Sequence, residues 1–343
     1  MSGGSAGQYR MPAEWAPHAG CWMIWPCREQ TFAGELEAAR VVTGQLARAL
    51  ARFEPLSVLA RPADLADARL RCGQAVRLLP CPDLVDSWMR DVGPSFVRHR
   101  QSGDLAGVDW IFNTWGEAYP GANDDPLAGW VLEQLGVPRL RAPLVLEGGA
   151  IHVDGEGTLL TTEQCLLNPN RNPHLDRAGI EAILAEYLGV ERIIWLGAGL
   201  VDDMTDGHVD NLACFVRPGV VLALASDDPE DANYAALQDN LRRLRTARDA
   251  RGRHLEVITV PQPAPRWQGS ERLSLSYINF YIANGAVLVP AFDDPLDGLA
   301  RDTIQAALPA RQVVQIPVLP ILAGGGGIHC ITQQQPLAEG KSS

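Results

Sequence analysis

Short apolar segments separated by a tight turn recur four times along the chain, and each pair predicts a β-hairpin. Every turn contains a glycine, which adopts the positive φ angles of tight turns at no steric cost. The paired segments are 94–97 with 108–111, 150–153 with 158–161, 211–216 with 220–224, and 279–282 with 286–289. The turns lie too far apart for a solenoid, but their spacing suits a repeat of a hairpin, a helix and another strand.

Amphipathic helices are predicted between the hairpins. The clearest is 175–188, where apolar residues keep a helical spacing up to Gly189. Weaker patterns predict helices over 125–135, 229–250 and 295–308, each starting at an Asp-Pro pair, and proline is favoured in the first turn of a helix. Apolar strands at 192–196 and 313–316 follow two of these helices. This order of elements predicts an α/β protein.

A fifth unit is visible only as two halves, one toward each end of the sequence. The halves are segments 21–26 and 327–332. A sheet built from both would close a ring of units, and a closed ring leaves no free sheet edge at the seam. We therefore expect five similar units around an axis.

The composition is that of a globular protein, because 46% of the 343 residues are hydrophobic and 20% are charged. Prolines and glycines are spread throughout the chain and no linker divides it, which predicts a single domain over 1–343. No apolar run approaches the length of a membrane span, and segment 1–9 lacks the apolar core of a secretion signal. We therefore expect neither a membrane protein nor a secreted one.

The charge balance argues against polyanionic partners. Asp and Glu number 41 against 29 Lys and Arg, so the formal net charge is -12 at pH 7. Such a surface repels nucleic acids and anionic membranes and attracts a small cationic ligand. The seven cysteines form no C-x-x-C pair, which fits reduced thiols in the cytoplasm. The sequence leaves the oligomeric state open, a homo-oligomer included.

Polar residues recur at the start of the first strand in the predicted units. They are Asp91, Glu147, His208, Asp210 and Cys330. In a ring of similar units these positions face the same end of the axis, so side chains far apart in sequence would converge on one pocket. Such convergence is expected of an active site.

Each of these residues also has a simpler structural explanation. Asp91 follows Arg90 and could form a surface ion pair or a turn, and His208 could pair with Asp210 on one strand face. Glu147 lies in an apolar run, where an unpaired carboxylate is costly to bury, and this favours a functional role.

Cys330 could likewise be a small core side chain, the role expected of Cys72, Cys165 and Cys214. It differs from these three by following four consecutive glycines, 324–327, which let the backbone approach a ligand closely.

A cysteine, a histidine and three carboxylates are compatible with more than one chemistry. Only His208 and Asp210 have metal-ligand spacing, so no metal is expected. A papain-like hydrolase acts on neutral carbonyls and has no need of three acids. A planar guanidinium does need acids, because two carboxylates can hold it while a thiolate attacks its central carbon. An imidazolium would protonate the departing ammonia, and water would then release a urea-type product from the S-alkylthiouronium.

Several strings of the sequence, taken in order, resemble motifs of the agmatine deiminases, in the peptidylarginine-deiminase-like group. They are Met11-Pro-Ala-Glu-Trp with Trp22-Met-Ile-Trp-Pro, Ser87-Trp-Met-Arg-Asp-Val-Gly-Pro, Leu146-Glu-Gly-Gly, Leu166-Leu-Asn-Pro-Asn-Arg-Asn-Pro, Thr205-Asp-Gly-His-Val-Asp-Asn, Ser276-Tyr-Ile-Asn-Phe-Tyr-Ile-Ala-Asn-Gly and Ile328-His-Cys-Ile-Thr-Gln-Gln-Gln-Pro. The resemblance implies the pentein fold, a five-bladed α/β-propeller of ββαβ units, over about 11–336 of a single catalytic domain. It also implies hydrolysis of agmatine to N-carbamoylputrescine and ammonia without a cofactor.

The resemblance implies a role for each candidate residue. It places the nucleophile on Cys330, the acid/base pair on His208 and Glu147, and guanidinium binding on Asp91 and Asp210, with Trp88 in the pocket wall.

Three departures from the family pattern concern the substrate. Met204 stands where the family has a glutamate, Gly327 where it has an asparagine, and the stretch 262–273 is shorter than the family's loop. Asp202 or Asp203 could take over the role of the missing glutamate.

Two alternatives remain open at this point. The chain could deiminate another guanidino compound, such as peptidyl-arginine, or it could bind guanidines without turnover. The second alternative has no use for a nucleophile, so a thiol titration that finds one unusually reactive cysteine would favour an enzyme.

Overall fold

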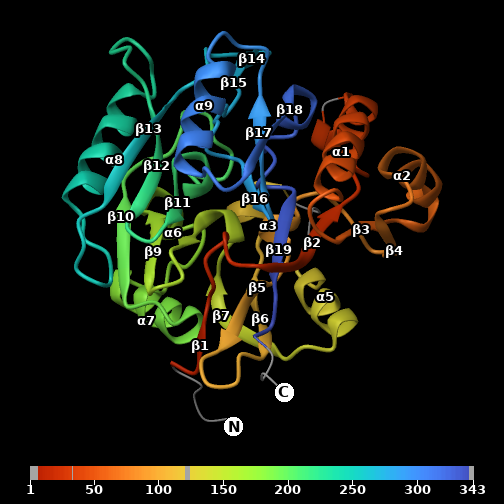
Figure 1. Cartoon of the computed structure of the whole chain (residues 1–343), viewed down its shortest axis with the longest axis horizontal. Coiled ribbons are helices and arrows are strands. Elements are labelled where there is room, and N and C mark those ends of the chain that lie inside the picture. Colours follow the sequence, from red (N-terminus) through yellow and green to blue (C-terminus); the bar gives the residue numbers. More distant parts are fainter. Residues whose placement is uncertain (1–6, 33, 120–123, 340–343) are drawn as a thin grey trace.

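Five β-sheets repeat one arrangement of strands in the computed structural model, which describes residues 7–32, 34–119 and 124–339 (Figure 1). In each sheet an antiparallel pair is followed by a third strand parallel to the second. The sheets are β5 (Ser95–His99), β6 (Leu105–Ile111) and β7 (Arg139–Val145); β8 (His152–Val153), β9 (Thr158–Thr162) and β10 (Arg192–Leu196); β11 (Ala213–Arg217), β12 (Val220–Ala225) and β13 (Glu256–Pro261); β16 (Tyr281–Ala283), β17 (Ala286–Ala291) and β18 (Gln312–Pro317); and β19 (Thr332–Pro336), β2 (His18–Ile24) and β3 (Leu56–Ala60).

Three small additions accompany this pattern. Strand β1 (Tyr9–Arg10) extends one sheet beside β5, and β4 (Arg77–Pro80) extends another beside β3. Strands β14 (Trp267–Gln268) and β15 (Glu271–Arg272) form a separate short hairpin.

The four predicted hairpins are confirmed, with tip glycines at positive φ angles from 73° to 78°. The first strands of three hairpins begin two residues later than predicted, at β8, β11 and β16. Short 3-10 turns, η3 (Gly148–Ala150) and η4 (Val209–Asn211), precede β8 and β11. These turns interrupt the ladder where the candidate site residues lie.

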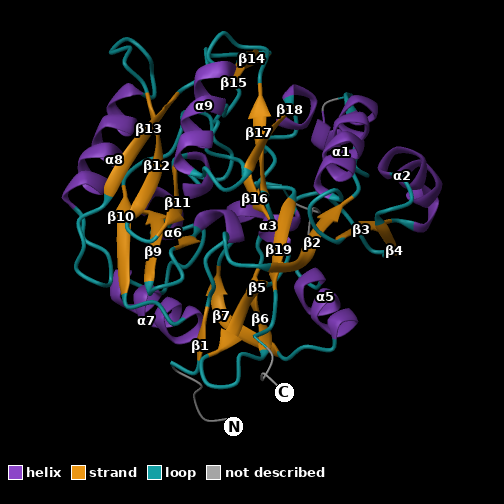
Figure 2. Ribbon diagram, in the orientation of Figure 1, coloured by secondary structure: helices purple, strands orange, loops and turns teal. Residues whose placement is uncertain are grey.

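The fifth sheet joins segments from the two ends of the sequence, but the predicted segment 327–332 forms turns, and the strand β19 begins only at its last residue. Strand β19 pairs antiparallel with β2, so that Gln333 lies opposite Trp22 and Thr332 opposite Met23. Strand β5 contacts β19, and β8 contacts β11, which brings first strands of different sheets together. Figure 2 shows the longer helices toward the outside of the view and the strands nearer the middle.

The predicted helices are present with adjusted bounds. Helix α7 (Arg177–Leu188) begins after Asp176, whose side chain accepts a hydrogen bond from the Gly179 backbone N–H at 2.8 Å, and it ends at Gly189 with φ 66°. The others are α5 (Leu127–Leu135), α8 (Tyr234–Thr246) and α9 (Asp297–Ala307). Helix α8 is shorter than 229–250 because turns occupy both flanks of the predicted range.

Two helices were not predicted from the sequence, α1 (Leu36–Leu50) and α2 (Leu65–Cys72). The buried face of α1 carries Val42, Leu46 and Leu50 at helical spacing, together with the small residue Gly44. A Cβ on Gly44 would lie 2.8 Å from the Arg71 Cβ, so the small residue allows α1 and α2 to pack closely. The remaining short helical turns are η1 (Glu29–Phe32), η2 (Pro62–Asp64), α3 (Met89–Val92), α4 (Thr114–Glu117), α6 (Glu163–Leu166) and α10 (Leu319–Leu322).

The sheets bury apolar side chains in two clusters. One includes Trp22, Val58 and Val287, and the other includes Leu144 and Leu159. Each such side chain contributes roughly 1.5–3 kcal/mol on burial, which makes the strands rigid supports for the polar residues that precede them. Within the described part of the chain, no helix is long and apolar enough to cross a membrane.

Candidate active site

The five predicted polar residues lie directly before the first strands of four sheets. Asp91 lies on α3 before β5, Glu147 precedes η3 and β8, His208 and Asp210 lie at η4 before β11, and Cys330 precedes β19. A Cβ placed on Gly149 would be 2.5 Å from Nδ1 of His208 and 3.0 Å from a carboxylate oxygen of both Asp91 and Asp210. Gly149 therefore lets these side chains converge.

His208 lies between two carboxylates rather than against Asp210. Its Nδ1 is 3.8 Å from Oδ1 of Asp91, and its Nε2 is 3.8 Å from Oε2 of Glu147. Burial alone would lower the pKa of His208, but the charge of Asp91 and contacts with Cys165 and Glu147 raise it well above its usual value. The alternative explanation, in which His208 pairs with Asp210, does not apply, because each ring nitrogen faces a different acid.

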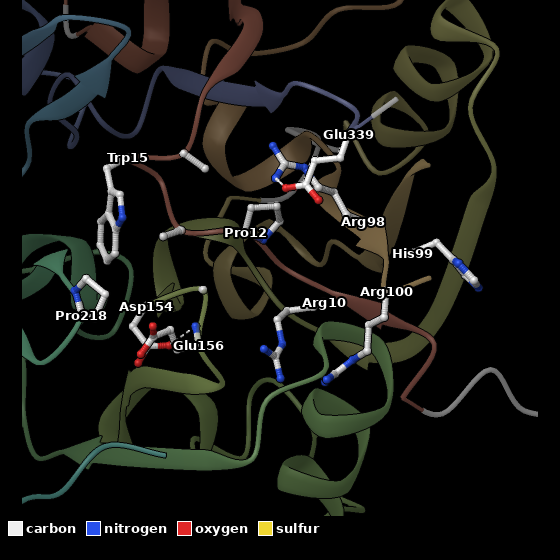
Figure 3. Close-up of a pocket in the computed structure, with 13 residues that line it drawn as sticks. Arg10, Pro12, Trp15, Arg98, His99, Arg100, Asp154, Glu156, Pro218 and Glu339 are labelled. Carbon is white, nitrogen blue, oxygen red and sulfur yellow. Dashed lines mark hydrogen bonds and ion pairs between the residues drawn. The ribbon is translucent and has the colours of Figure 1, made fainter. Parts of the chain in front are cut away.

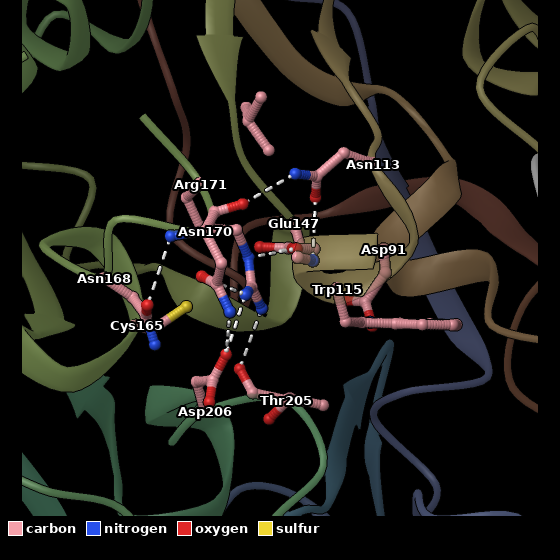
Figure 4. Close-up of polar contacts among 12 residues, drawn as sticks. Asp91, Asn113, Trp115, Glu147, Cys165, Asn168, Asn170, Arg171, Thr205 and Asp206 are labelled. Atoms are coloured by element: carbon pink, nitrogen blue, oxygen red, sulfur yellow. Dashed lines mark hydrogen bonds and ion pairs between the residues drawn. The ribbon is translucent and has the colours of Figure 1, made fainter. Parts of the chain in front are cut away.

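Glu147 is held by a buried arginine that sequence reasoning missed (Figure 4). Arg171 Nε donates to Oε1 of Glu147 at 2.8 Å, its Nη1 donates to Oδ2 of Asp206 at 2.8 Å, and its Nη2 donates to the Thr205 carbonyl at 3.0 Å. Burial raises the pKa of Glu147, but His208 and Arg171 outweigh this and lower it. The only sequence signal for Arg171 is its place in the Leu166 to Pro173 string.

Asp91 is oriented by two donors. Its Oδ2 accepts a hydrogen bond from Nε1 of Trp115 at 2.9 Å, and its Oδ1 accepts one from the Gly149 backbone N–H at 3.0 Å. Burial raises the pKa of Asp91. Trp115 has φ 55°, a strained value for a residue with a side chain, and such strain often occurs at functional sites.

Asp210 belongs to a buried chain of acids and imidazole. Its Oδ2 is 2.8 Å from Nδ1 of His329, whose Nε2 is 2.9 Å from Oε2 of Glu14. An imidazole that serves two carboxylates must donate from both nitrogens, so His329 is positively charged. Burial and Arg90 lower the pKa of His329, but Glu14 and Asp210 raise it on balance, and His329 in turn holds the pKa of Asp210 below its usual value against burial.

The Cys330 thiol lies beside Asp210 and an amide. Its Sγ is 3.8 Å from Oδ2 of Asp210 and 3.2 Å from Nδ2 of Asn279. Burial, followed by the charges of Asp210 and Asp91, raises the pKa of this thiol well above its usual value. A Cβ on Gly327 would be 2.5 Å from Oδ1 of Asn279, so this glycine makes room for the amide.

Cys165 is not simply a core side chain. Its Sγ, one carboxylate oxygen of Glu147 and a ring nitrogen of His208 all lie within 4.8 Å of one another. Burial raises the pKa of the Cys165 thiol. Cys330 is therefore not the only cysteine beside the acidic residues, and the three clustered groups are of the kinds that bind metal ions.

Three buried polar atoms of the site have no hydrogen-bond partner among the described residues. They are Oε2 of Glu147, Nε2 of His208 and Oδ1 of Asp210. Unsatisfied buried polar atoms are rare in folded proteins and call for a functional explanation.

A pocket of about 480 Å³ borders this site, and Trp115 links the two because it lines the pocket and binds Asp91. Trp88 and Met204 lie in the wall of the pocket. Two acids also line it, Asp86 and Glu271, the latter from β15. Asp202 and Asp203 do not line the pocket; they accept hydrogen bonds from the backbone N–H groups of Arg272 and Thr205.

A second pocket, of about 530 Å³, contains none of the candidate site residues (Figure 3). Its most prominent charges are already paired, since Arg10 lies 2.9 Å from Glu191 and Arg98 lies 2.7 Å from Glu339. This pocket therefore offers no cluster of reactive groups.

A sequence model of the Porphyromonas-type peptidyl-arginine deiminase family matches residues 10–336. The chain belongs to this family. An agmatine deiminase of Pseudomonas aeruginosa (strain LESB58) is 47% identical to this family member, over 96% of the chain and 95% of its own length. An agmatine deiminase of Ectopseudomonas mendocina (strain ymp) is 46% identical over 97% and 96%.

A solved structure gives the same result for the fold of this family member. The agmatine deiminase of Enterococcus faecalis superposes with a TM-score of 0.91 and 36% identity, covering 96% of each chain. The resemblance and the α/β class predicted from the sequence are both confirmed.

Proposed function

We propose that this chain hydrolyses agmatine to N-carbamoylputrescine and ammonia, with Cys330 as the nucleophile. The observation that carries the proposal is the convergence of Asp91, Asp210 and His208 around Gly149, with the Cys330 thiol 3.8 Å from Asp210. The names of the relatives support the same substrate. No cofactor is required, because the thiol itself supplies the attacking electron pair.

Asp91 and Asp210 bind the guanidinium in this proposal. Oδ1 of Asp210 is buried, has no hydrogen-bond partner within the described part of the chain, and can accept an N–H of the substrate. Hydrogen bonds between two charged groups are stronger than neutral ones, and the planar guanidinium can donate to both acids at once. Its positive charge also offsets the two carboxylates that raise the pKa of Cys330, so substrate binding favours the thiolate.

The thiolate then adds to the central guanidinium carbon. His208 donates its proton to the departing nitrogen, the C–N bond breaks, and ammonia leaves a thiouronium on Cys330. Water adds to this carbon and gives its proton to His208 or Glu147. Breaking the C–S bond releases the carbamoyl product and restores the thiol. Arg171 keeps one oxygen of Glu147 occupied, so the other oxygen faces His208.

Four neighbours act through the residues that touch the substrate. Trp115 and the Gly149 backbone fix Asp91, and His329, backed by Glu14, fixes Asp210 and keeps it ionised. A protein that only bound guanidines would need the aspartates but not a thiol beside an imidazole and a third acid.

The pocket that borders the site holds the substrate's alkyl tail in this proposal. Trp88, Trp115 and Met204 supply apolar surface for four methylene groups. Asp86 and Glu271 are the acids of this wall, and a terminal ammonium needs such an acceptor when it leaves water. Met204 itself offers only polarizable apolar contact.

At the level of the whole chain, we propose one catalytic domain in which the five sheets form the blades of a pentein propeller around a pseudo-fivefold axis. Support comes from the strand order, which is the same in all five sheets. A cytoplasmic location is proposed on the seven cysteines, all of which are free thiols.

An ammonia-release assay tests the proposed function. The panel is agmatine, arginine, guanidinobutyrate and a peptidyl-arginine, each with wild type and Cys330→Ala. Agmatine should give the highest kcat/KM, and the variant should release no ammonia. Turnover of peptidyl-arginine in preference to agmatine would show that agmatine is not the main substrate. If no compound is turned over, the proposed enzymatic activity is refuted.

A further inference from the structure

The thiol of Cys165 has no part in the proposed reaction, yet it lies against the acid/base pair. Cys165 is on α6, where its backbone N–H donates to the Thr162 hydroxyl oxygen at 3.2 Å, and its side chain is fully buried. Its Sγ, a carboxylate oxygen of Glu147 and a ring nitrogen of His208 lie within 4.8 Å of one another. These three groups come from three separate segments, before η3, on α6 and before η4.

A second observation concerns the polar atoms of this cluster that lack hydrogen bonds. Oε2 of Glu147 and Nε2 of His208 are 3.8 Å apart, both are buried, and neither has a hydrogen-bond partner among the described residues. Two ligand atoms therefore face each other beside a thiol, in an ion pair that is too long to be a hydrogen bond.

The donor set identifies the kind of ion that would fit. Thiolate sulfur and imidazole nitrogen suit Zn²⁺ and poorly suit Mg²⁺ or Ca²⁺, which prefer oxygen. Zinc with three protein ligands and one open position is a common arrangement, with bonds of about 2.0 Å to nitrogen and about 2.3 Å to sulfur. Ligand atoms within 4.8 Å of one another can reach such bonds after a small inward shift.

The local charges also favour a divalent cation. Glu147 and the Cys165 thiolate supply two negative charges, and Asp91 lies 3.8 Å from the other ring nitrogen of His208. Arg171 opposes the ion with one positive charge, but it is already paired with Glu147 and Asp206.

We propose that Glu147, Cys165 and His208 form an inhibitory binding site for Zn²⁺. On binding, the protons of the Cys165 thiol and of His208 Nε2 pass to solvent, and the metal takes the freed electron pairs together with one from Glu147. The ion then occupies both groups of the acid/base pair, so turnover stops until the metal is removed. The inhibition, but not the binding, rests on the proposed function.

Zinc titration of ammonia release tests the inhibition. Wild type and Cys72→Ala, which lacks a buried cysteine on α2, should be inhibited at the same Zn²⁺ concentration, and excess EDTA should restore both. Cys165→Ala should need about tenfold more zinc or more, with each protein measured against its own metal-free rate. Equal zinc sensitivity of Cys165→Ala and wild type would overturn the proposal.

Cobalt binding tests the site without any turnover. Cys330→Ala removes the neighbouring thiol, and Co²⁺ added to this protein should give the near-ultraviolet absorption of a cobalt thiolate. The band should persist in Cys72→Ala/Cys330→Ala and vanish in Cys165→Ala/Cys330→Ala, with Cys165→Ser as the replacement if the alanine protein does not fold. A missing band in Cys330→Ala itself overturns the site, whatever the substrate of the enzyme.

Discussion

The charge around Cys330 decides when this thiol reacts. Burial and two carboxylates raise its pKa, so the free protein holds a thiol rather than a thiolate. A bound guanidinium would offset the negative charge of those carboxylates. Reactivity therefore depends on the substrate, so a thiol titration would detect one unusually reactive cysteine only when a guanidinium ligand is bound.

The first prediction concerns the nucleophile. Cys330→Ala should abolish ammonia release from agmatine and leave the circular dichroism spectrum unchanged, whereas Cys72→Ala should keep most of the activity. Burial raises the pKa of Cys72 to about 12, so that thiol is inert near neutral pH. Substantial turnover by Cys330→Ala would exclude covalent catalysis.

The second prediction concerns the two acids that are proposed to bind the guanidinium. Asp91→Asn and Asp210→Asn keep the size of the side chain but remove a charge from a buried pair worth about 1.5–3 kcal/mol. Each should lower kcat/KM for agmatine by about tenfold or more, since about 1.4 kcal/mol corresponds to a factor of about ten. Asp302→Asn, on the surface, is the control. Full activity in either variant would show that this aspartate does not bind the guanidinium.

The third prediction uses the pH profile. Cationic His329 lowers the pKa of Asp210, so His329→Gln should let Asp210 take up a proton at higher pH. The acid limb of kcat/KM for agmatine should therefore move to higher pH, whereas His174→Gln, at an exposed histidine, should not move it. An unmoved acid limb would leave His329 with a purely structural role.

The same pair makes stability depend on pH. The contribution of His329 to the free energy of unfolding is complete below its unfolded pKa and is lost as pH rises through the raised folded pKa. The contribution of Asp210 is complete above its unfolded pKa and is lost as pH falls through the lowered folded value. Both contributions are therefore complete at pH values above the unfolded pKa of Asp210 and below the unfolded pKa of His329.

The convergence of Asp91, Glu147, His208, Asp210 and Cys330 could be predicted because they occupy equivalent positions in a repeat. Arg171, His329, Glu14 and Asn279 could not, because each supports another residue through contacts that only the folded chain creates. The contact of Cys165 with His208 was missed for the same reason, since nothing in an apolar neighbourhood distinguishes one buried thiol from another.

At the scale of elements, the hairpin β14–β15 forms part of the pocket wall that is proposed to contact the substrate's tail. It lies within the stretch 262–273, which is expected to be shorter than the family's loop, and it places Glu271 in the pocket wall. No hydrogen bond or ion pair engages the Glu271 carboxylate among the described residues, so it is available to a ligand.

The fourth prediction follows from this wall. Glu271→Gln should lower kcat/KM for agmatine by severalfold more than for butylguanidine, which lacks the ammonium, because only agmatine loses an opposite charge. Met204→Glu should raise the preference for agmatine by adding a charge to the same wall. The measurement is the ratio of the two kcat/KM values, with Glu133→Gln on α5 as the control. A ratio that is the same in all four proteins would show that neither position contacts the tail.

Hairpins and α7 could be predicted because apolar alternation, turn glycines and a capped helix agree with one another. Helix α1 could also have been predicted, because Val42, Leu46 and Leu50 keep a helical spacing, whereas α2 is short and buries only Ala68 and Cys72. The 3-10 turns before β8 and β11 were also missed, because they depend on side chains that converge from other sheets.

At the scale of the whole molecule, the excess of acidic residues attracts a cationic substrate before it reaches the pocket. The fifth prediction is that kcat/KM for agmatine, with two positive charges, falls more steeply with added salt than that for singly charged butylguanidine. The kcat of both should change little, because saturated enzyme no longer depends on encounter. Parallel salt dependences of the two kcat/KM values would show that the net charge of -12 does not affect how the substrate enters the pocket.

The sheet that joins β19 to β2 also sets the order in which the protein can be completed during synthesis. Strand β2 leaves the ribosome early, but its antiparallel partner, together with Cys330, is translated only after the other four sheets. Until then β2 keeps an unpaired edge that can associate with other nascent chains. A ribosome that stalls before Cys330 thus yields a product without a nucleophile and with a sheet open on one side, so incomplete translation adds to the chaperone load but not to agmatine turnover.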